Sequence, residues 1–481
     1  MMLKFSCIKY TTIYTTKEGM YKIMYKTGVI MEEKNNIEKV MPMIMIVFIL
    51  AGTLMEGFNI SAPMISKDYE ISSSTVSILS SVSLLVMGVA YMIYASLSDF
   101  LSVRKLMIIG IVILSLGSAV GFFFTDSFIM VVISRAIQMA GGTCASALLI
   151  LTATRYLSEN NRMKYYGFNT ACFSGGQAVG ILIGGLFATY LGWKYLFLVP
   201  MLSLFTIPFI LRYLPEDSKE NKTKIDFIGL FLVACISLFV SLYFTVMNIY
   251  ILIACILTIV IFFIYISKKE DAFITIDFFK NKKYMNVMLI VFLTYSIQGS
   301  YSFLFSFMAS KVHGIQLDMI SMILLPSYLV SLSIGIFGGK ITQKLGVIKT
   351  IAIAFTCLVS ALVLGAMFLD RSIILLGFIS CLFNGGFSIL YTPIMTMVIN
   401  SLPKEKTGAG LGFFNLCIKI TSSIGVVITG KLLTMEFIQT NAIINFMQGE
   451  GIIYSNILLG FVICILLSSA AVKIAKRNLS L

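Results

Sequence analysis

The sequence predicts an all-α membrane protein, and three observations support this prediction. Hydrophobic residues make up 58% of the 481 residues and charged residues only 12%, too few to cover the surface of a soluble protein. Apolar runs of about 20 residues recur along the chain, and a helix of that length crosses a hydrocarbon layer of ~30 Å. The alternating polar and apolar pattern of a membrane β-barrel does not occur. Helices are expected, because each run in lipid must satisfy its own backbone hydrogen bonds.

About fourteen membrane-spanning helices are expected, and an even number places both chain ends on the same side. The predicted spans are 41–62, 76–95, 106–124, 128–152, 166–188, 192–213, 226–246, 249–267, 285–309, 319–340, 350–368, 372–397, 408–432 and 454–473. Two charged stretches, 214–225 and 268–283, bracket the seventh and eighth spans. We therefore expect a polar tail at 1–38, a six-helix bundle at 39–214, an inserted helix pair with cytoplasmic linkers at 215–284, a second six-helix bundle at 285–475 and a tail at 476–481.

The tail at 1–38 lacks the apolar segment of a signal peptide. Met31 opens the stretch Met-Glu-Glu-Lys-Asn-Asn and is a plausible natural start. Residues 1–30 are interpreted either as an extension ahead of that start or as a disordered tail.

The net charge of +14 is explained by the positive-inside rule, and no nucleic-acid partner is expected. With the N-terminus inside, the inner loops and the C-terminal tail hold 22 Lys and Arg residues, whereas the outer loops hold five. The opposite orientation would invert this bias, so both termini are expected in the cytoplasm.

No metal site and no cofactor are predicted. The nine cysteines are mostly isolated inside apolar runs, and His313 is the only histidine. The chain also lacks the Gly-x-x-x-x-Gly-Lys-Ser/Thr phosphate loop, so ATP-driven pumping by this chain alone is not supported.

A short polar loop, Tyr94 to Lys105, follows the second span and carries Asp99 and Arg104. A looser copy, 339–346, lies between two apolar runs of the second half. Polar loops at matching places in two hydrophobic halves indicate a transporter built from two related bundles.

This loop resembles the motif Gly-x-Leu-(Ala/Ser)-Asp-x-x-Gly-x-Arg/Lys of the major facilitator superfamily, with Ala95 and Ser102 in place of the glycines. Arg135-Ala-Ile-Gln138 resembles the Arg-x-x-Gln signature of its fourteen-helix drug:proton antiporter branch. The stretch 174–185 is similar to the glycine-rich antiporter motif of that branch, with Ile181 in place of its proline.

A more specific resemblance is to the Gram-positive tetracycline efflux proteins. It is carried by Trp193, Thr407-Gly-Ala-Gly410, Asn415 and Tyr454-Ser-Asn456. Those proteins have acidic residues where this chain has Gln177 and Ser422 or Ser423, which favours a more divergent, broader exporter.

The resemblance implies the superfamily's fold, a bacterial plasma membrane and a monomer. Its expected partners are a small hydrophobic substrate, protons and the lipid bilayer. Asp99 and Arg104, with Lys105, would form a cytoplasmic latch that gates the movement of helices.

Three ionisable side chains are predicted deep inside spans, where charges are costly and usually functional. Glu56 is interpreted as a proton site, or alternatively as an outer residue that reaches water or pairs with Arg135. Arg135 keeps its charge under ordinary conditions, so we expect it to assist proton coupling or to bind an anionic cargo group, unless it forms a structural ion pair. Lys419 either contacts an acidic cargo or extends to an interface. Their net positive charge favours an anionic or zwitterionic lipophile over a simple cation.

Polar and aromatic side chains at mid-depth are the candidates for the substrate site, although each also fits an interhelical hydrogen bond. The set comprises Asn59, Gln138, Gln177, Gln298, Tyr301, Tyr328, Asn384, Tyr391, Asn415 and Lys419. Gly176, Gly180 and Gly184 share one helix face and predict a close helix contact that opens and closes during transport.

Together these features predict a secondary transporter, not an enzyme. It would export hydrophobic drug-like compounds, tetracycline first, in exchange for protons by alternating access. The alternatives are an exporter of anionic lipophiles such as fatty acids, or an importer of another small molecule. A membrane metalloprotease is excluded because His-Glu-x-x-His needs two histidines, and a receptor would carry a sizeable extramembrane domain.

Overall fold

The computed structural model describes residues 17–98, 101–157, 159–216, 226–269, 275–403, 407–444 and 448–479. Side chains are described from residue 37 on, except at 154, 159–164, 166–167, 407–409 and 477–479. Every regular element in these ranges is a helix, and fourteen of the described helices are long and apolar enough to cross a membrane. The predicted all-α membrane fold with about fourteen spans is confirmed.

The helices follow the predicted spans closely. In chain order they are α1 (Lys17–Asp68), α2 (Ser73–Leu97), α3 (Val103–Phe123), α4 (Phe128–Tyr156), α5 (Glu159–Leu186), α6 (Ile207–Tyr213), α7 (Phe227–Val246), α8 (Ile249–Lys268), α9 (Ile276–Lys280), α10 (Lys282–Val312), α11 (Leu317–Leu345), α12 (Val347–Phe368), α13 (Ile373–Asn400), α14 (Thr407–Leu432), α15 (Glu436–Thr440) and α16 (Gly451–Leu479). The sixth span is completed by a 3₁₀ segment, Trp193–Thr206, ahead of α6.

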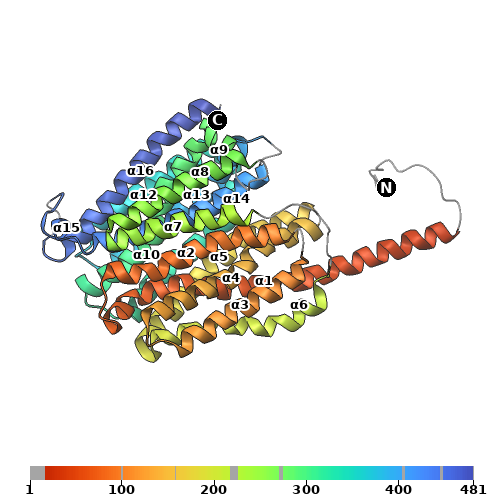
Figure 1. The fold of residues 1–481 in the computed structure, drawn as a ribbon, viewed down its shortest axis with the longest axis horizontal. Coiled ribbons are helices and arrows are strands. Elements are labelled where there is room, and N and C mark those ends of the chain that lie inside the picture. The colour runs from red at the N-terminus through yellow and green to blue at the C-terminus, as the bar shows by residue number, and fades with distance from the viewer. Residues whose placement is uncertain are drawn as a thin grey trace.

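Helix α1 is much longer than the predicted span 41–62 and extends beyond the bundle at its N-terminal end (Figure 1). Between Gly28 and Pro42 the sequence contains neither glycine nor proline, so nothing there ends the helix. The polar stretch expected to precede the first span is therefore helical from Lys17. The rest of the predicted tail, residues 1–16, lies outside the described residues.

Short polar side chains cap several spans where the chain re-enters the apolar layer. Ser72 accepts a hydrogen bond from the backbone N of Thr75 at the start of α2, and Ser102 accepts one from Lys105 at the start of α3. Asp226 caps α7 and also accepts a 2.9 Å hydrogen bond from Nζ of Lys269, just after α8. This ion pair joins the two ends of the α7–α8 hairpin.

The elements from α1 to α6 lie together on one side of the molecule and those from α10 to α16 on the other (Figure 1). Helix α7 packs against both α2 and α14, so the inserted hairpin covers one line of contact between the two groups. The boundaries 214/215 and 284/285 remain predictions.

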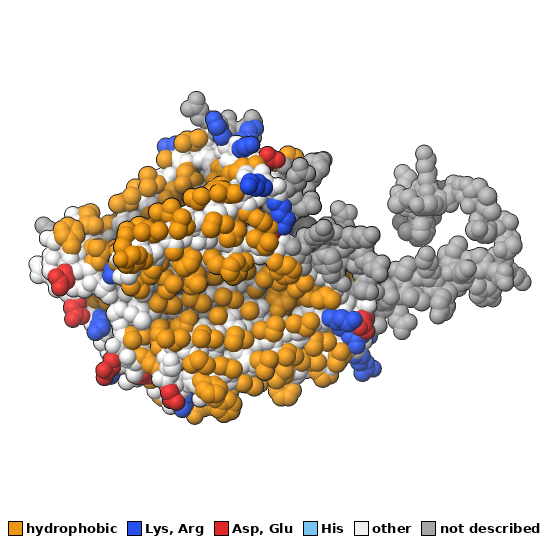
Figure 2. All heavy atoms as spheres, in the orientation of Figure 1, with side chains coloured by type: hydrophobic (Ala, Val, Ile, Leu, Met, Phe, Trp, Pro, Cys, Tyr) orange, Lys and Arg blue, Asp and Glu red, His pale blue; other side chains and the backbone are white. Residues whose placement is uncertain are grey.

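Charged side chains gather at the two ends of the helices, with a broad apolar band between them (Figure 2). Large apolar side chains are exposed on this band, for example Phe205 at 76% and Phe231 at 67%. Such exposure is stable only in contact with lipid, as expected of a multi-pass membrane protein.

At one end of the molecule, the N-terminal helices contact the C-terminal helices directly. Nδ2 of Asn59 in α1 donates to Oγ of Ser302 in α10, at 3.3 Å. Oγ of Ser81 in α2 lies 2.7 Å from Oγ of Ser423 in α14. We call this the closed end; it is the end at which α1 finishes and α2 begins.

Candidate transport site

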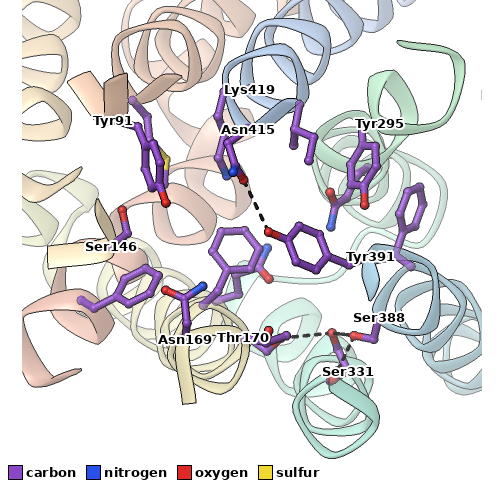
Figure 3. A pocket seen from close by; sticks show the side chains of 18 of the residues that line it. Tyr91, Ser146, Asn169, Thr170, Tyr295, Ser331, Ser388, Tyr391, Asn415 and Lys419 are labelled. Atoms are coloured by element: carbon purple, nitrogen blue, oxygen red, sulfur yellow. Dashed lines mark hydrogen bonds between the residues drawn. The ribbon is translucent and has the colours of Figure 1, made fainter. Parts of the chain in front are cut away.

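A cavity of about 130 Å³ lies between the two groups of helices, toward the end opposite the closed end. Helices α1, α2, α4 and α5 line it on one side, and α10, α11, α13 and α14 on the other. Figure 3 shows Tyr91, Tyr295 and Tyr391 around it, with Asn415 and Lys419 beside each other on α14. Aromatic rings and polar side chains both line the cavity, so it can hold a compound that combines an aromatic body with polar groups.

Five of the ten predicted substrate residues line this cavity. They are Gln177, Gln298, Tyr391, Asn415 and Lys419. The hydroxyl of Tyr391 donates to Oδ1 of Asn415 at 3.4 Å, across the gap between α13 and α14.

The other five predicted residues lie outside the lining. Asn59 and Tyr328 surround Glu56, and Gln138 binds Arg135. Tyr301 stacks on Phe383 with ring centroids 3.8 Å apart, and its hydroxyl lies 2.8 Å from Oγ of Ser380. Asn384 donates to Oγ of Ser327 at 2.8 Å. Asn59 also donates to Ser302 on α10 and Gln138 to Ser118 on α3, so all five side chains make interhelical hydrogen bonds, which was the alternative for each of them.

Several lining residues that were not predicted lie one helical turn from a predicted one. Phe173 precedes Gln177 by four positions, and Phe387 precedes Tyr391 by four. Tyr295 precedes Gln298 by three. Extending each predicted residue along its own helix face would have found them, because positions i, i+3 and i+4 share a face.

Glu56 is buried, with 2% of its surface exposed, directly behind the cavity wall. Its Oε1 accepts a 2.9 Å hydrogen bond from Nε2 of Gln177, which itself lines the cavity. Its Oε2 lies 3.4 Å from Nδ2 of Asn59, and the hydroxyls of Ser302 and Tyr328 also interact with it. The carboxyl group is thus held by neutral groups from α1, α5, α10 and α11.

Arg135 is 1% exposed and does not pair with Glu56, since no ion pair joins them among the described side chains. Its guanidinium donates to the carbonyl oxygen of Leu54 at 3.1 Å and to Oε1 of Gln138 at 3.2 Å. It also lies over the ring of Phe58, 4.2 Å from the centroid. Because Leu54 and Phe58 flank Glu56 on α1, Arg135 fixes the helix that carries the carboxyl group.

Lys419 extends from α14 across the cavity to α5. Its Nζ lies 4.6 Å from the ring centroid of Phe173. A Cβ atom on Gly88 of α2 would lie 3.0 Å from Cβ of Lys419, so α2 crosses α14 at this residue.

The predicted glycine contact joins α5 to α1. A Cβ on Gly176 would lie 3.0 Å from Cα of Gly52, and one on Gly180 would lie 2.5 Å from the carbonyl oxygen of Thr53. A Cβ on Gly184 would lie 2.6 Å from Cα of Gly57. Both helices belong to the same predicted bundle. The next residue, Gly185, instead faces α11, where a Cβ would lie 2.4 Å from the carbonyl oxygen of Leu317.

The predicted latch residue Asp99 lies outside the described residues. Of its two basic partners, Lys105 pairs with Glu216 at 3.0 Å and Arg104 lies 3.9 Å from the same carboxylate. Hydrogen bonding and the positive charge of Lys105, together with Arg104, hold the pKa of Glu216 below its usual range. Arg155 at the end of α4 donates to the carbonyl oxygen of Ser98 at 2.7 Å.

The described helices include fourteen candidate spans, and eight of them line a cavity between two groups of helices, an arrangement typical of polytopic membrane transporters. The family model of the Major Facilitator Superfamily matches residues 44–426, and the chain belongs to this superfamily.

The chain is also similar to curated proteins and solved structures. It is 24% identical over 425 residues to the quinolone resistance protein NorB of Staphylococcus aureus (strain MRSA252), covering 84% of this chain and 90% of NorB. The POT family transporter PepTSo matches with a TM-score of 0.66 at 12% identity, covering 91% of this chain and 98% of PepTSo. The D-xylose-proton symporter matches with a TM-score of 0.60 at 14% identity, covering 89% of this chain and 96% of the symporter. At these identities the structures show a common fold.

Proposed function

We propose that this protein exports hydrophobic, aromatic drug-like compounds in exchange for protons. One observation carries the proposal: an aromatic cavity shares a wall residue, Gln177, with the hydrogen-bond network of a buried carboxyl group, Glu56. The cavity would hold the compound and Glu56 would hold the proton. Because both use Gln177, occupation of the cavity would alter the hydrogen bonds that hold the carboxyl group.

The direction of transport rests on the predicted topology and on the relatives. With the N-terminus inside, the closed end faces outward and the cavity lies toward the cytoplasm, where an exported compound would enter. NorB is named for quinolone resistance, so quinolones join tetracycline as first candidate compounds. The fold alone does not decide direction, because the matching structures include a proton symporter.

The mechanism would be alternating access by a monomer. Opening the closed end requires separating Asn59 from Ser302 and Ser81 from Ser423, while the helices around the cavity come together. Arg104 and Lys105, which the structure places in the first turn of α3, would gate this movement through their pairing with Glu216.

The test is accumulation of tetracycline and of a fluorescent quinolone in a pump-deficient bacterium that expresses the protein. Wild type should lower accumulation, and a protonophore should reverse the effect. Glu56→Gln should abolish proton-dependent export, whereas the matched control Glu436→Gln, at an exposed carboxylate, should behave like wild type. Equal proton-dependent export by wild type and Glu56→Gln, at equal membrane expression, would refute Glu56 as the proton site.

A further inference from the structure

Lys419 is the only charged side chain among the described residues that line the cavity. It makes no ion pair within 4.0 Å in the part of the chain that the structure describes. Its Cβ lies against Gly88, where α2 crosses α14, so the side chain starts from a close contact between the two groups of helices. Its positive charge thus lies in a cavity whose described lining holds no carboxylate, and it interacts with Glu56 only from beyond ion-pair distance.

The ring of Phe173 supplies the contact that Lys419 makes in this state. A cation over an aromatic face is stabilised by the ring quadrupole, but less than by a hydrogen-bonded anion. Phe173 lies on α5 and Lys419 on α14, so the contact joins opposite walls of the cavity. An anion that enters between these walls would replace the ring of Phe173 as the partner of Lys419. The ring would then be free to stack on the compound.

Two further polar atoms at the cavity have no hydrogen-bond partner among the described residues. They are Oδ1 of Asn169 on α5 and the hydroxyl of Tyr295 on α10. Buried polar groups are normally paired, so these two atoms are available to hydrogen-bond a compound in the cavity. The Tyr295 hydroxyl can donate to an anionic oxygen, and Oδ1 of Asn169 can accept from a donor group on the same compound.

We infer that the transported compounds carry an anionic group, such as a carboxylate, on an aromatic body, and that Lys419 is the residue that selects for it. The carboxylate binds Nζ of Lys419, and the rings of Phe173, Phe387 and Tyr391 pack on the aromatic body. This inference names the substrate class for the proposed function and rests on it. A neutral or purely cationic compound of the same shape leaves the lysine without an anion and binds less well.

Nalidixic acid and its ethyl ester make the decisive pair of probes, because they share a ring system and differ in the anionic group. Binding of each is measured by equilibrium dialysis with the purified full-length protein. Wild type should bind the acid at least tenfold more tightly than the ester. Lys419→Met should lose at least tenfold affinity for the acid and keep its affinity for the ester, which also shows that the variant is folded. Lys419→Arg should keep the preference, and the control Lys431→Met, in the last turn of α14, should match wild type.

Equal affinity of wild type for acid and ester, an unchanged preference in Lys419→Met, or binding of neither probe would each overturn the inference. Failure of the proposed function has a different signature. In that case the purified protein keeps its Lys419-dependent preference for the acid, but cells expressing it show no protonophore-sensitive export of any compound.

Discussion

Gln177 is the residue through which the cavity meets Glu56. Its Nε2 donates a 2.9 Å hydrogen bond to the carboxyl group, and its side chain forms part of the cavity wall. The tetracycline efflux proteins that the chain resembles have an acidic residue at this position. Here Gln177 instead donates to a carboxyl group on α1.

We predict that Gln177→Met lowers proton-driven export by about ten- to a hundredfold, because a hydrogen bond to a charged group contributes about 1.5–3 kcal/mol. The measurement is the initial rate of tetracycline efflux driven by an imposed pH gradient in proteoliposomes. Gln298→Met is the matched control, since Gln298 also lines the cavity but makes no described contact with Glu56. An equal loss in both variants would assign the effect to cavity polarity and contradict the specific link.

The candidate site was only partly predictable at this scale. Intramembrane charge identified Glu56, Arg135 and Lys419, because a charge in an apolar span has few explanations. The sequence could not show that Asn415 and Tyr391 line the cavity whereas Asn384 and Tyr301 do not. A polar side chain at mid-depth can equally well hydrogen-bond a neighbouring helix or face a cavity. The direction in which each helix face points is decided by packing between distant segments.

Regularly spaced glycines on α5 allow close packing against α1. The spacing i, i+4, i+8 predicted close approach by another helix, and the structure identifies that helix as α1, at Gly52, Thr53 and Gly57. Which neighbour fills the face could not be predicted, because the spacing describes only one of the two surfaces. The same contact brings Glu56 of α1 within hydrogen-bonding distance of Gln177 on α5.

We predict that Gly180→Ala destabilises the protein by about 1–3 kcal/mol, because the added methyl group would lie 2.5 Å from the carbonyl oxygen of Thr53 and force α1 and α5 apart. Thermal unfolding of the purified protein in detergent measures the effect. Gly339→Ala is the control: its Cβ would meet nothing within 4 Å, and alanine favours a helix by about 1 kcal/mol over glycine. A melting temperature unchanged in Gly180→Ala would show that the two helices separate at little cost.

Across the whole molecule, the fold class and the number of spans follow from apolar runs, because the bilayer leaves few alternatives for a hydrophobic chain. Which end is closed does not follow from the sequence. That is decided by contacts between distant helices, such as Ser81 with Ser423 and Asn59 with Ser302. Alternating access requires these contacts to break in each cycle, whereas compound binding at the cavity leaves them intact.

A disulfide across the closed end should therefore stop transport and spare binding. We predict this for Ser81→Cys with Ser423→Cys in a background free of the native cysteines, since the two Oγ atoms are 2.7 Å apart. Oxidation should abolish tetracycline export in proteoliposomes, reduction should restore it, and the two single-cysteine variants should be insensitive to both. Continued transport by the fully cross-linked protein would show that the closed end need not open.

The charge of the compound sets how strongly the membrane potential drives the whole cycle. If one proton enters per turnover, export of a neutral compound moves one elementary charge and export of an anion moves two. Each charge contributes about 2.3 kcal/mol per 100 mV, roughly a fiftyfold change in the attainable gradient.

We predict that in proteoliposomes with a potassium diffusion potential and no pH gradient, the logarithm of the nalidixate gradient rises with potential twice as steeply as that of its ethyl ester. Wild-type protein with each probe above its Kd gives the comparison, and protein-free liposomes correct for leakage. Equal slopes would mean that the acid crosses with its charge neutralised by a second proton, and that Lys419 releases it in protonated form.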